Sequence, residues 1–154
     1  MKKQQKKLLL AQIDKKIATF SQLKASSPPN AGWVNAIRVA LGMSLKQLGK
    51  KLNISPQGAK DIERREKDGS ITINALRETA AALDMQLVYG FLPRGETLQK
   101  TIEKRASQMA TEIVMRTSQS MHLEDQAVSK EELKRAIDEK TQQIINEMPK
   151  YLWD

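Results

Sequence analysis

Residues 43–63, MSLKQLGKKLNISPQGAKDIE, decide the fold of the middle of this chain. They predict two short helices joined by a tight turn. Ser44 is a favourable N-cap for the first helix, because its hydroxyl can accept a hydrogen bond from a free backbone N–H. Apolar residues then repeat at helical spacing, at Leu45, Leu48 and Leu52.

The second half of this run contains its own turn and start signals. Asn53 tolerates the left-handed backbone conformation that a sharp turn requires. Ser55 is a second N-cap, and Pro56 follows at the first helical position, where a missing N–H costs nothing. Ala59 and Ile62 would face inward and leave the opposite side of the helix exposed. This is how a helix-turn-helix presents its recognition helix to the DNA major groove.

The flanking segments predict further amphipathic helices. Upstream and downstream of the run, apolar residues again lie at helical spacing: Trp33, Val34, Ile37 and Leu41 before it, and Leu76, Ala80 and Leu83 after it. The chain as a whole is predicted to be mainly α, with a helix-turn-helix domain, an N-terminal helix, one short strand and two C-terminal helices.

The central segment resembles the helix-turn-helix domains of the Cro and phage-repressor type. The resemblance covers residues 37–84, about a third of the chain. That family has an Arg ahead of a Gly-x-Ser/Thr helix start and a Glu at the end of the recognition helix. Arg38, Gly42, Ser44 and Glu63 match this pattern. The resemblance implies a buried ion pair between Arg38 and Glu63.

Two residues depart from the family pattern, and both departures are small. Gly49 occupies a position where Ala is usual, and Asn53 one where Gly is usual. Residues 64–69 follow Glu63 with a charged run that suggests a modestly extended loop.

The outward side chains of the second helix are candidates for reading bases. A glutamine can pair with N6 and N7 of adenine, and a carboxylate can accept from N4 of cytosine. The base contacts are therefore predicted to come from Gln57, Lys60, Asp61 and Ser55. Phosphate contacts are predicted from Ser44 and Lys46, at the start of the first helix, and from Arg64, Arg65 and Lys67. For these last three, a solvated loop is an equally good interpretation.

Three segments are predicted along the chain: residues 1–27, residues 28–84 and residues 85–154. The first is a basic amphipathic helix and linker, with seven lysines against a single acid, Asp14. Its basic face has three interpretations: a solvated surface, an arm on the DNA backbone, or a membrane-surface helix. Its apolar stripe is expected to pack on a partner chain or on the core.

The last segment is predicted to mediate homodimerisation. Residues 86–92, QLVYGFL, form the single strand-like run and end at Pro93. A lone strand needs a partner for its backbone groups, and the same strand of a second copy would supply one. Two helices follow, over about residues 97–118 and from a capping box that opens at Ser129.

Composition favours an anionic partner and excludes several other functions. The net charge is +8 and the pI about 9.7, which suits an anionic partner: DNA, RNA or an anionic membrane surface. Together with the motif, this charge predicts double-stranded DNA as the partner. The chain has no cysteine and a single histidine, and it lacks a nucleophile–base pair, a phosphate-binding glycine loop and a metal-ligand cluster. We therefore expect no enzymatic activity and no cofactor or metal. No apolar run is long enough to span a membrane, so a cytoplasmic location is expected.

Over residues 1–120 the chain is also similar to a narrower family, the mobile mystery protein A regulators. The matching features are the Lys-rich N-terminal helix and the stretches at residues 32–38, 42–49 and 87–93. The resemblance implies a bacterial regulator, encoded beside a Fic-domain protein, that represses its own operon. The expected two-fold dimer separately predicts that the operator is an inverted repeat.

An alternative is an antitoxin-like protein that inhibits a Fic-domain partner by direct contact through residues 96–154. Inhibitors of that class usually insert a Ser/Thr-x-x-x-Glu-Gly/Asn helix motif. The sequence has no convincing instance of this motif, which favours the DNA-binding interpretation.

Overall fold

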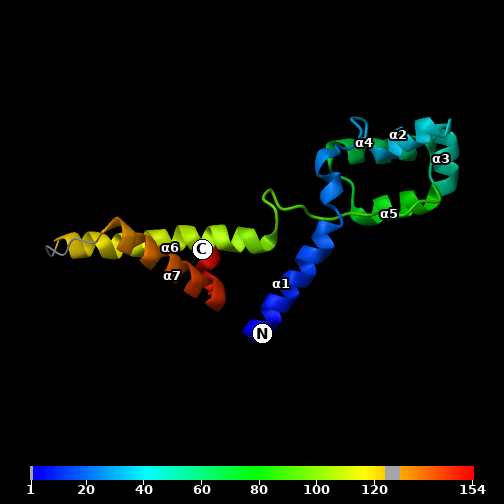
Figure 1. Ribbon diagram of the computed structural model, residues 1–154. Helices are drawn as coiled ribbons and strands as arrows, with labels where there is room; N and C mark the ends of the chain where they lie inside the picture. The colour runs from blue at the N-terminus through cyan, green and yellow to red at the C-terminus, as the bar shows by residue number, and fades with distance from the viewer. Residues whose placement is uncertain (1, 124–128) are drawn as a thin grey trace. The chain divides into compact units, whose positions relative to one another are not determined.

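The computed structural model describes residues 2–123 and 129–154, which are mainly helical (Figure 1). The chain divides into two compact units, which we call the central unit (residues 22–90) and the terminal unit (residues 1–21 and 91–154). The central unit contains α2 (Trp33–Ala40), α3 (Leu45–Leu52), α4 (Pro56–Asp68) and α5 (Ile73–Ala82). The terminal unit contains α1 (Lys3–Ala18), α6 (Leu98–Leu123), α7 (Lys130–Glu147) and the 3-10 helix η2 (Lys150–Trp153), and a further 3-10 helix, η1 (Ser21–Ala25), spans the boundary.

The core of the central unit is built from one apolar face of each of its helices. α3 packs on α4, α2 packs on α4, and α5 packs on α3. The apolar stripes predicted from the sequence largely meet in this core, whose buried residues are Val34, Leu48, Ala59, Ile62 and Leu83. Trp33 and Leu41, predicted in the stripe before the motif, are instead exposed, because they lie at the two ends of the short helix α2. Their burial removes apolar surface from water, which is the main source of stability for so small a unit.

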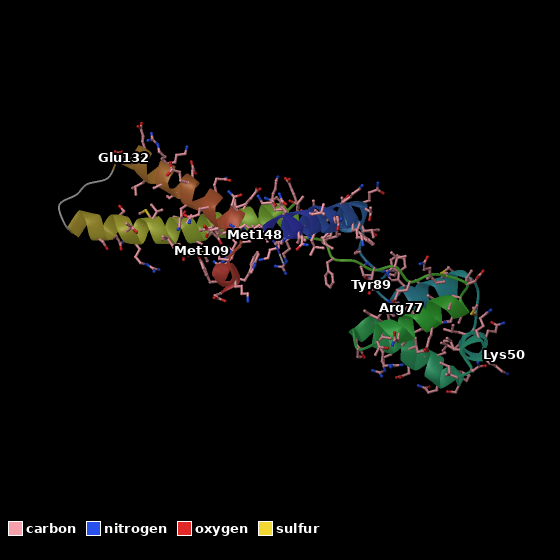
Figure 2. All side chains as sticks on the ribbon, turned by 90° about the horizontal axis from the view of Figure 1, so that it is seen from below. Lys50, Arg77, Tyr89, Met109, Glu132 and Met148 are labelled. Carbon is pink, nitrogen blue, oxygen red and sulfur yellow. The ribbon has the colours of Figure 1, made fainter. Side chains whose placement is uncertain are left out.

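The core of the terminal unit is the long contact between α6 and α7. Ala106 and Ala110 lie one turn apart on the same face of α6, are fully buried, and leave room for α7 to approach closely. Ile102, Ile144 and Leu152 complete the buried cluster. Figure 2 labels Met109 on α6 and Met148 at the end of α7, and both pack against this cluster.

The N-terminal helix α1 belongs to the terminal unit, although the sequence had suggested a separate segment. Its one acid, Asp14, accepts hydrogen bonds from the backbone N–H groups of Leu98 (2.8 Å) and Gln99 (3.1 Å). These groups open α6 and have no partner within that helix, so a carboxylate is favourable there. Leu10 of α1 packs against the α6–α7 core. Asp14 and Leu10 thus connect α1 with helices more than 80 residues later in the chain.

The strand predicted over residues 86–92 is wrong. Residues 85–93 have no regular secondary structure, and no strand occurs in the part of the chain that the structure describes. No backbone–backbone hydrogen bond joins residues 86–92 to another described residue. The physical reason is that a strand exists only when another strand pairs with it, and this chain supplies none there.

The loop predicted after Glu63 is also wrong. α4 continues to Asp68 and ends at Gly69, whose φ of 81° places it in the left-handed conformation typical of a helix C-terminus. Arg64 forms ion pairs with Asp61 and Asp68, three residues before and four residues after it, and such pairs stabilise a helix. The charged run is therefore the last part of the helix.

The C-terminal helices begin close to where the sequence placed them. α6 starts at Leu98, and Ser129 caps α7 by accepting a hydrogen bond from Glu132 N (3.2 Å). The tail after α7 is held by Arg105, which donates to the backbone oxygens of Leu152 and Asp154, at 2.7 Å each. Among the described residues, no helix combines the length and the apolar character needed to cross a lipid bilayer.

Candidate nucleic-acid interface

The first helix of the motif, α3, begins with a complete capping box. The Ser44 hydroxyl oxygen accepts from Gln47 N (3.2 Å), and the Gln47 side chain accepts from Ser44 N (2.8 Å). Two backbone donors that α3 itself cannot satisfy are thereby paired. The box fixes the start of α3, and Lys46 lies exposed in its first turn.

The turn between α3 and α4 is tight and depends on two residues. Asn53 adopts φ 56° and ψ 38°, the left-handed conformation expected for it. Ile54 N then donates to Gly49 O at 2.9 Å. A Cβ at Gly49 would lie only 2.7 Å from Ile54 O, so the backbone after the turn passes directly over this glycine. The usual Ala would not fit here without a shift of the turn.

The second helix, α4, begins at Pro56 and is capped by Ser55, whose hydroxyl oxygen accepts from Gly58 N at 3.0 Å. Because one lone pair of the oxygen serves as a cap, the Ser55 hydroxyl keeps its O–H donor and one acceptor lone pair for a base. Both start signals found in the sequence operate in the structure.

The outer face of α4 carries the predicted base-contacting side chains. Gln57 and Lys60 are exposed, and Asp61 is partly exposed beside them. Ala59 and Ile62 point into the core on the other side. The helix therefore exposes its polar face over several turns.

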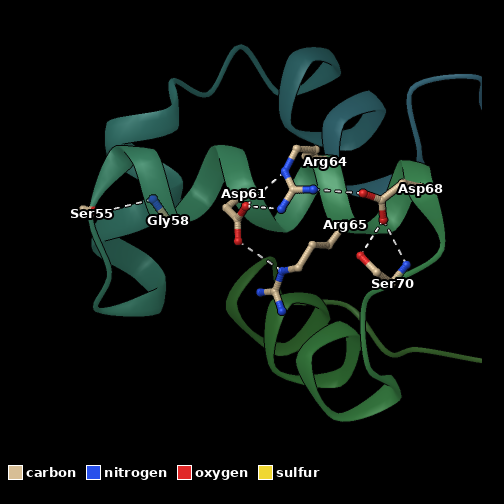
Figure 3. Close-up of polar contacts among 7 residues, drawn as sticks. All are labelled: Ser55, Gly58, Asp61, Arg64, Arg65, Asp68 and Ser70. Atoms are coloured by element: carbon tan, nitrogen blue, oxygen red, sulfur yellow. Dashed lines mark hydrogen bonds and ion pairs between the residues drawn. The ribbon is translucent and has the colours of Figure 1, made fainter.

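The predicted phosphate contacts do not all lie together. Lys67 is exposed near the end of α4. Arg65 is only 35% exposed and extends toward α5, away from Arg64 (Figure 3). There it lines a cavity of about 290 Å³ together with Glu78 and Thr79 of α5. This position sets Arg65 apart from the other predicted contacts.

Four charged residues of α4 form one network on its surface (Figure 3). Arg64 pairs with Asp61 at 2.6 Å and with Asp68 at 3.0 Å, and Arg65 Nε lies 3.2 Å from the other oxygen of Asp61. The hydrogen bond from Arg64, together with the nearby charges of Arg64 and Arg65, lowers the pKa of Asp61. Asp61 is therefore ionised and already has partners within its own helix.

Arg38 and Glu63, the pair implied by the family resemblance, are in contact between α2 and α4. Arg38 Nε donates to one oxygen of Glu63, and Arg38 Nη2 donates to the other at 3.2 Å. The side chains are 13% and 9% exposed. Burial raises the pKa of Glu63, but hydrogen bonds from Arg38 and Asn35 and the charge of Arg38 outweigh it, so the net shift of the pKa is downward.

Two residues that sequence reasoning missed complete this polar centre. Asn35 Nδ2 donates to Glu63 Oε2 at 2.7 Å. Glu66 accepts from the backbone N–H groups of Trp33 (2.8 Å) and Val34 (2.9 Å), which open α2. The sequence does contain a signal that could have pointed to such a partner. The N-cap of α2 is Gly32, which has no side chain to accept these hydrogen bonds, so another residue must do so.

Residues 34–89 match the model of the helix-turn-helix family. No curated protein and no solved structure matches the chain. The matched residues span α2 to α5, together with the capped motif and the exposed face of α4 described above. Residues 34–89 therefore form a helix-turn-helix domain of the Cro/C1 type, which indicates a DNA-binding transcription regulator.

Proposed function

We propose that this protein is a sequence-specific transcriptional repressor that acts as a homodimer on inverted-repeat operators. The observation that carries the proposal is the exposed polar face of α4, held in place by the capped turn and the Arg38–Glu63 pair. A helix presented in this way can enter the major groove with its side chains against base edges.

In this proposal Gln57 and Lys60 contact bases, because both are exposed on the first turns of α4. A glutamine pairs with adenine through two hydrogen bonds, and a lysine donates to guanine. Ser44, Lys46 and Lys67 contact phosphates on either side, which positions the helix without reading sequence. Lys46 also lies at the N-terminal end of α3, where the helix dipole favours an anion.

Operator selection with Gln57→Ala tests the base-reading part. Operators are first selected with the wild-type protein from fragmented genomic DNA. Gln57→Ala should relax preference at one base pair per half-site, a loss of about 1–3 kcal/mol of discrimination, and leave non-specific binding nearly intact. The matched control is Gln142→Ala, since Gln142 is an exposed glutamine of α7. Unchanged base preference in Gln57→Ala would refute the assignment.

We place the dimer contact in the connecting segment, residues 86–92. Val88 is 64% and Phe91 85% exposed, and the backbone of this segment has no backbone partner among the described residues. Pairing of the two copies of this segment would satisfy both the apolar side chains and the backbone groups. A two-fold dimer would then present two recognition helices to half-sites about 34 Å apart.

Sedimentation of two Val88 variants separates backbone pairing from side-chain contact. Val88→Pro removes an N–H that makes no backbone hydrogen bond within the described chain, so the monomer should remain folded while self-association weakens. Val88→Ala retains the N–H and should weaken association less. A wild-type protein that sediments as a monomer at micromolar concentration would contradict the proposed dimer.

The target operon is proposed from the resemblance to mobile mystery protein A regulators, which are encoded beside Fic-domain proteins. The selected genomic fragments should then include the promoter of the protein's own operon. A reporter driven by that promoter should be silenced when the protein is present. Activation of the reporter would exclude the repressor role, and copurification of a Fic-domain protein with the full chain would support the antitoxin alternative.

A further inference from the structure

Arg64 is held in one place although it is exposed to solvent. Its Nε and Nη2 donate to Asp61 Oδ1 at 3.1 and 2.6 Å, and its Nη1 donates to Asp68 Oδ2 at 3.0 Å (Figure 3). The side chain is nevertheless 62% exposed. A flexible arginine on a helix surface would lose rotamer freedom on binding DNA, whereas this one is already ordered.

Each of the two carboxylates is itself anchored by another residue. Asp68 Oδ1 accepts from the backbone N–H of Ser70 at 3.0 Å and from the Ser70 hydroxyl. Asp61 has its second oxygen 3.2 Å from Arg65 Nε. The guanidinium of Arg64 therefore lies between Asp68, which Ser70 holds by hydrogen bonds, and Asp61, which Arg65 holds by an ion pair.

The hydrogen bonds of Arg64 leave it with the donors that a guanine requires. A guanidinium has five N–H groups, and three of those of Arg64 are engaged by the carboxylates. The two that remain equal the number needed for a bidentate contact with O6 and N7 of guanine. Arg64 follows Gln57 by seven residues, or two helical turns, so both side chains lie on the same face of α4.

The local charge favours a base over a phosphate as the partner of Arg64. The four network residues, Asp61, Arg64, Arg65 and Asp68, have no net charge. A phosphate approaching Arg64 would therefore also meet two carboxylates. A guanine edge is neutral and gains from two directed hydrogen bonds without any counterion release. Lys67, by contrast, forms no ion pair in the described part of the chain, which suits it to attract the DNA backbone.

On the basis of the DNA-binding function proposed above, we propose that Arg64 reads a guanine in the major groove and that Asp61 and Asp68 are positioning residues for its guanidinium. Arg64 then contacts a base instead of a phosphate, and Asp61 acts through Arg64 instead of contacting cytosine directly. Specificity would come from the third turn of α4 as well as from its start.

The test measures the affinity of the full-length protein for a selected operator in which each guanine in turn is replaced by 7-deazaguanine, which lacks the N7 acceptor. For the wild type, one position per half-site should lower affinity about 5- to 150-fold, the range that corresponds to 1–3 kcal/mol. In Arg64→Ala that position should become insensitive, while every other position retains its effect. The slope of log affinity against log salt concentration should stay the same.

Four further variants distinguish a contact with a base from a purely electrostatic contribution to affinity. Arg64→Lys retains the charge but lacks the planar fork, so it should also lose the guanine effect while keeping the salt slope. Asp68→Asn should weaken the guanine effect with Arg64 still present, and Asp68→Glu should restore part of it. Lys67→Ala should reduce the salt slope by about 0.9 and leave every base preference unchanged.

Two results would overturn the inference, and they differ from failure of the proposed function. If Arg64→Ala reduces the salt slope and leaves the 7-deazaguanine profile unchanged, Arg64 contacts a phosphate. If Asp68→Asn behaves as the wild type at the sensitive guanine, Asp68 has no positioning role. A wild-type protein that binds all sequences equally would instead overturn the proposed function. Circular dichroism of each variant confirms that it is folded.

Discussion

In both the central and the terminal unit, a carboxylate from a distant helix accepts hydrogen bonds from the first N–H groups of another helix. The two units differ in the contacts that hold their cores together. In the central unit Glu66 accepts from the first N–H groups of α2, and in the terminal unit Asp14 does so for α6. The central unit adds a buried ion pair between α2 and α4. In the described part of the terminal unit, every buried residue is apolar.

This difference shows where each unit is vulnerable. A buried charged pair contributes little net stability over apolar residues of the same volume, but loss of one partner leaves a costly unpaired charge. An apolar contact between long helices is spread over many residues and depends less on any one of them. Substitution of a single charged residue should therefore lower the free energy of unfolding more in the central unit than in the terminal unit.

The largest expected effect is that of Glu63→Ala. It leaves Arg38 buried without its carboxylate and removes the acceptor of Asn35, so the free energy of unfolding of the central unit should fall by about 3–5 kcal/mol. Chemical denaturation, monitored by the hydrogen exchange of α2 and α4, measures this fall in the free energy of unfolding. Glu78→Ala, on the exposed face of α5, is the matched control and should change stability by less than about 0.5 kcal/mol. Equal effects of the two variants would refute the conclusion that the central unit depends on the buried Arg38–Glu63 pair.

The Arg38–Glu63 pair also makes the free energy of unfolding depend on pH. This pH-dependent part should be no larger than the loss caused by Glu63→Ala. The pKa of Glu63 is lower in the folded chain than its ordinary value of 4.5. Its contribution to stability is therefore fully present above that value and is lost as the pH falls through the lower, folded pKa. Unfolding of the wild type and of Glu63→Gln, compared from neutral to acid pH, should show a difference that narrows below about pH 4.5. A difference that stays constant into the acid range would contradict the pairing.

A smaller loss of stability is expected when a methyl group is added at Gly49, next to the turn between α3 and α4. In Gly49→Ala the new Cβ would lie 2.7 Å from Ile54 O, and this backbone oxygen cannot move without opening the turn. The clash should cost about 1–3 kcal/mol and outweigh the gain in helix propensity of about 1 kcal/mol. Gly58→Ala is the control, because its Cβ would meet Ile54 at an ordinary 3.4 Å. Thermal unfolding should show opposite signs for the two variants, and stabilisation by both would mean that the turn is loosely packed.

The smallest effect is expected from Asp14→Ala in the terminal unit. It removes the acceptor of Leu98 N and Gln99 N, a loss comparable to that of a helix cap, about 0.5–2 kcal/mol. Hydrogen exchange should increase in α1 and the first turn of α6 and stay unchanged in α3 and α4. Asp138→Ala, an exposed aspartate of α7, is the control. If the two variants exchange alike, Asp14 does not hold α1.

The sequence alone was sufficient for the local structure of the helix-turn-helix motif. Ser44 and Ser55 cap their helices, and Asn53 turns the chain in the left-handed conformation, as predicted. These features depend on residues within four positions of one another, so sequence spacing alone reveals them. The apolar repeats of α2 to α5 likewise identified most of the core residues, although Trp33 and Leu41 are exposed.

The tertiary structure decided everything that depends on residues far apart in the chain. Asp14 accepts hydrogen bonds from the start of a helix 84 residues away, and Glu66 from the start of one 33 residues away. No local pattern marks such a partner. Residues 86–92 look like a strand in sequence but lack a neighbour to pair with, because β-propensity describes a surface that another strand must complete. Helix starts are encoded by local hydrogen bonds, whereas strand pairing and remote caps exist only once the chain has folded.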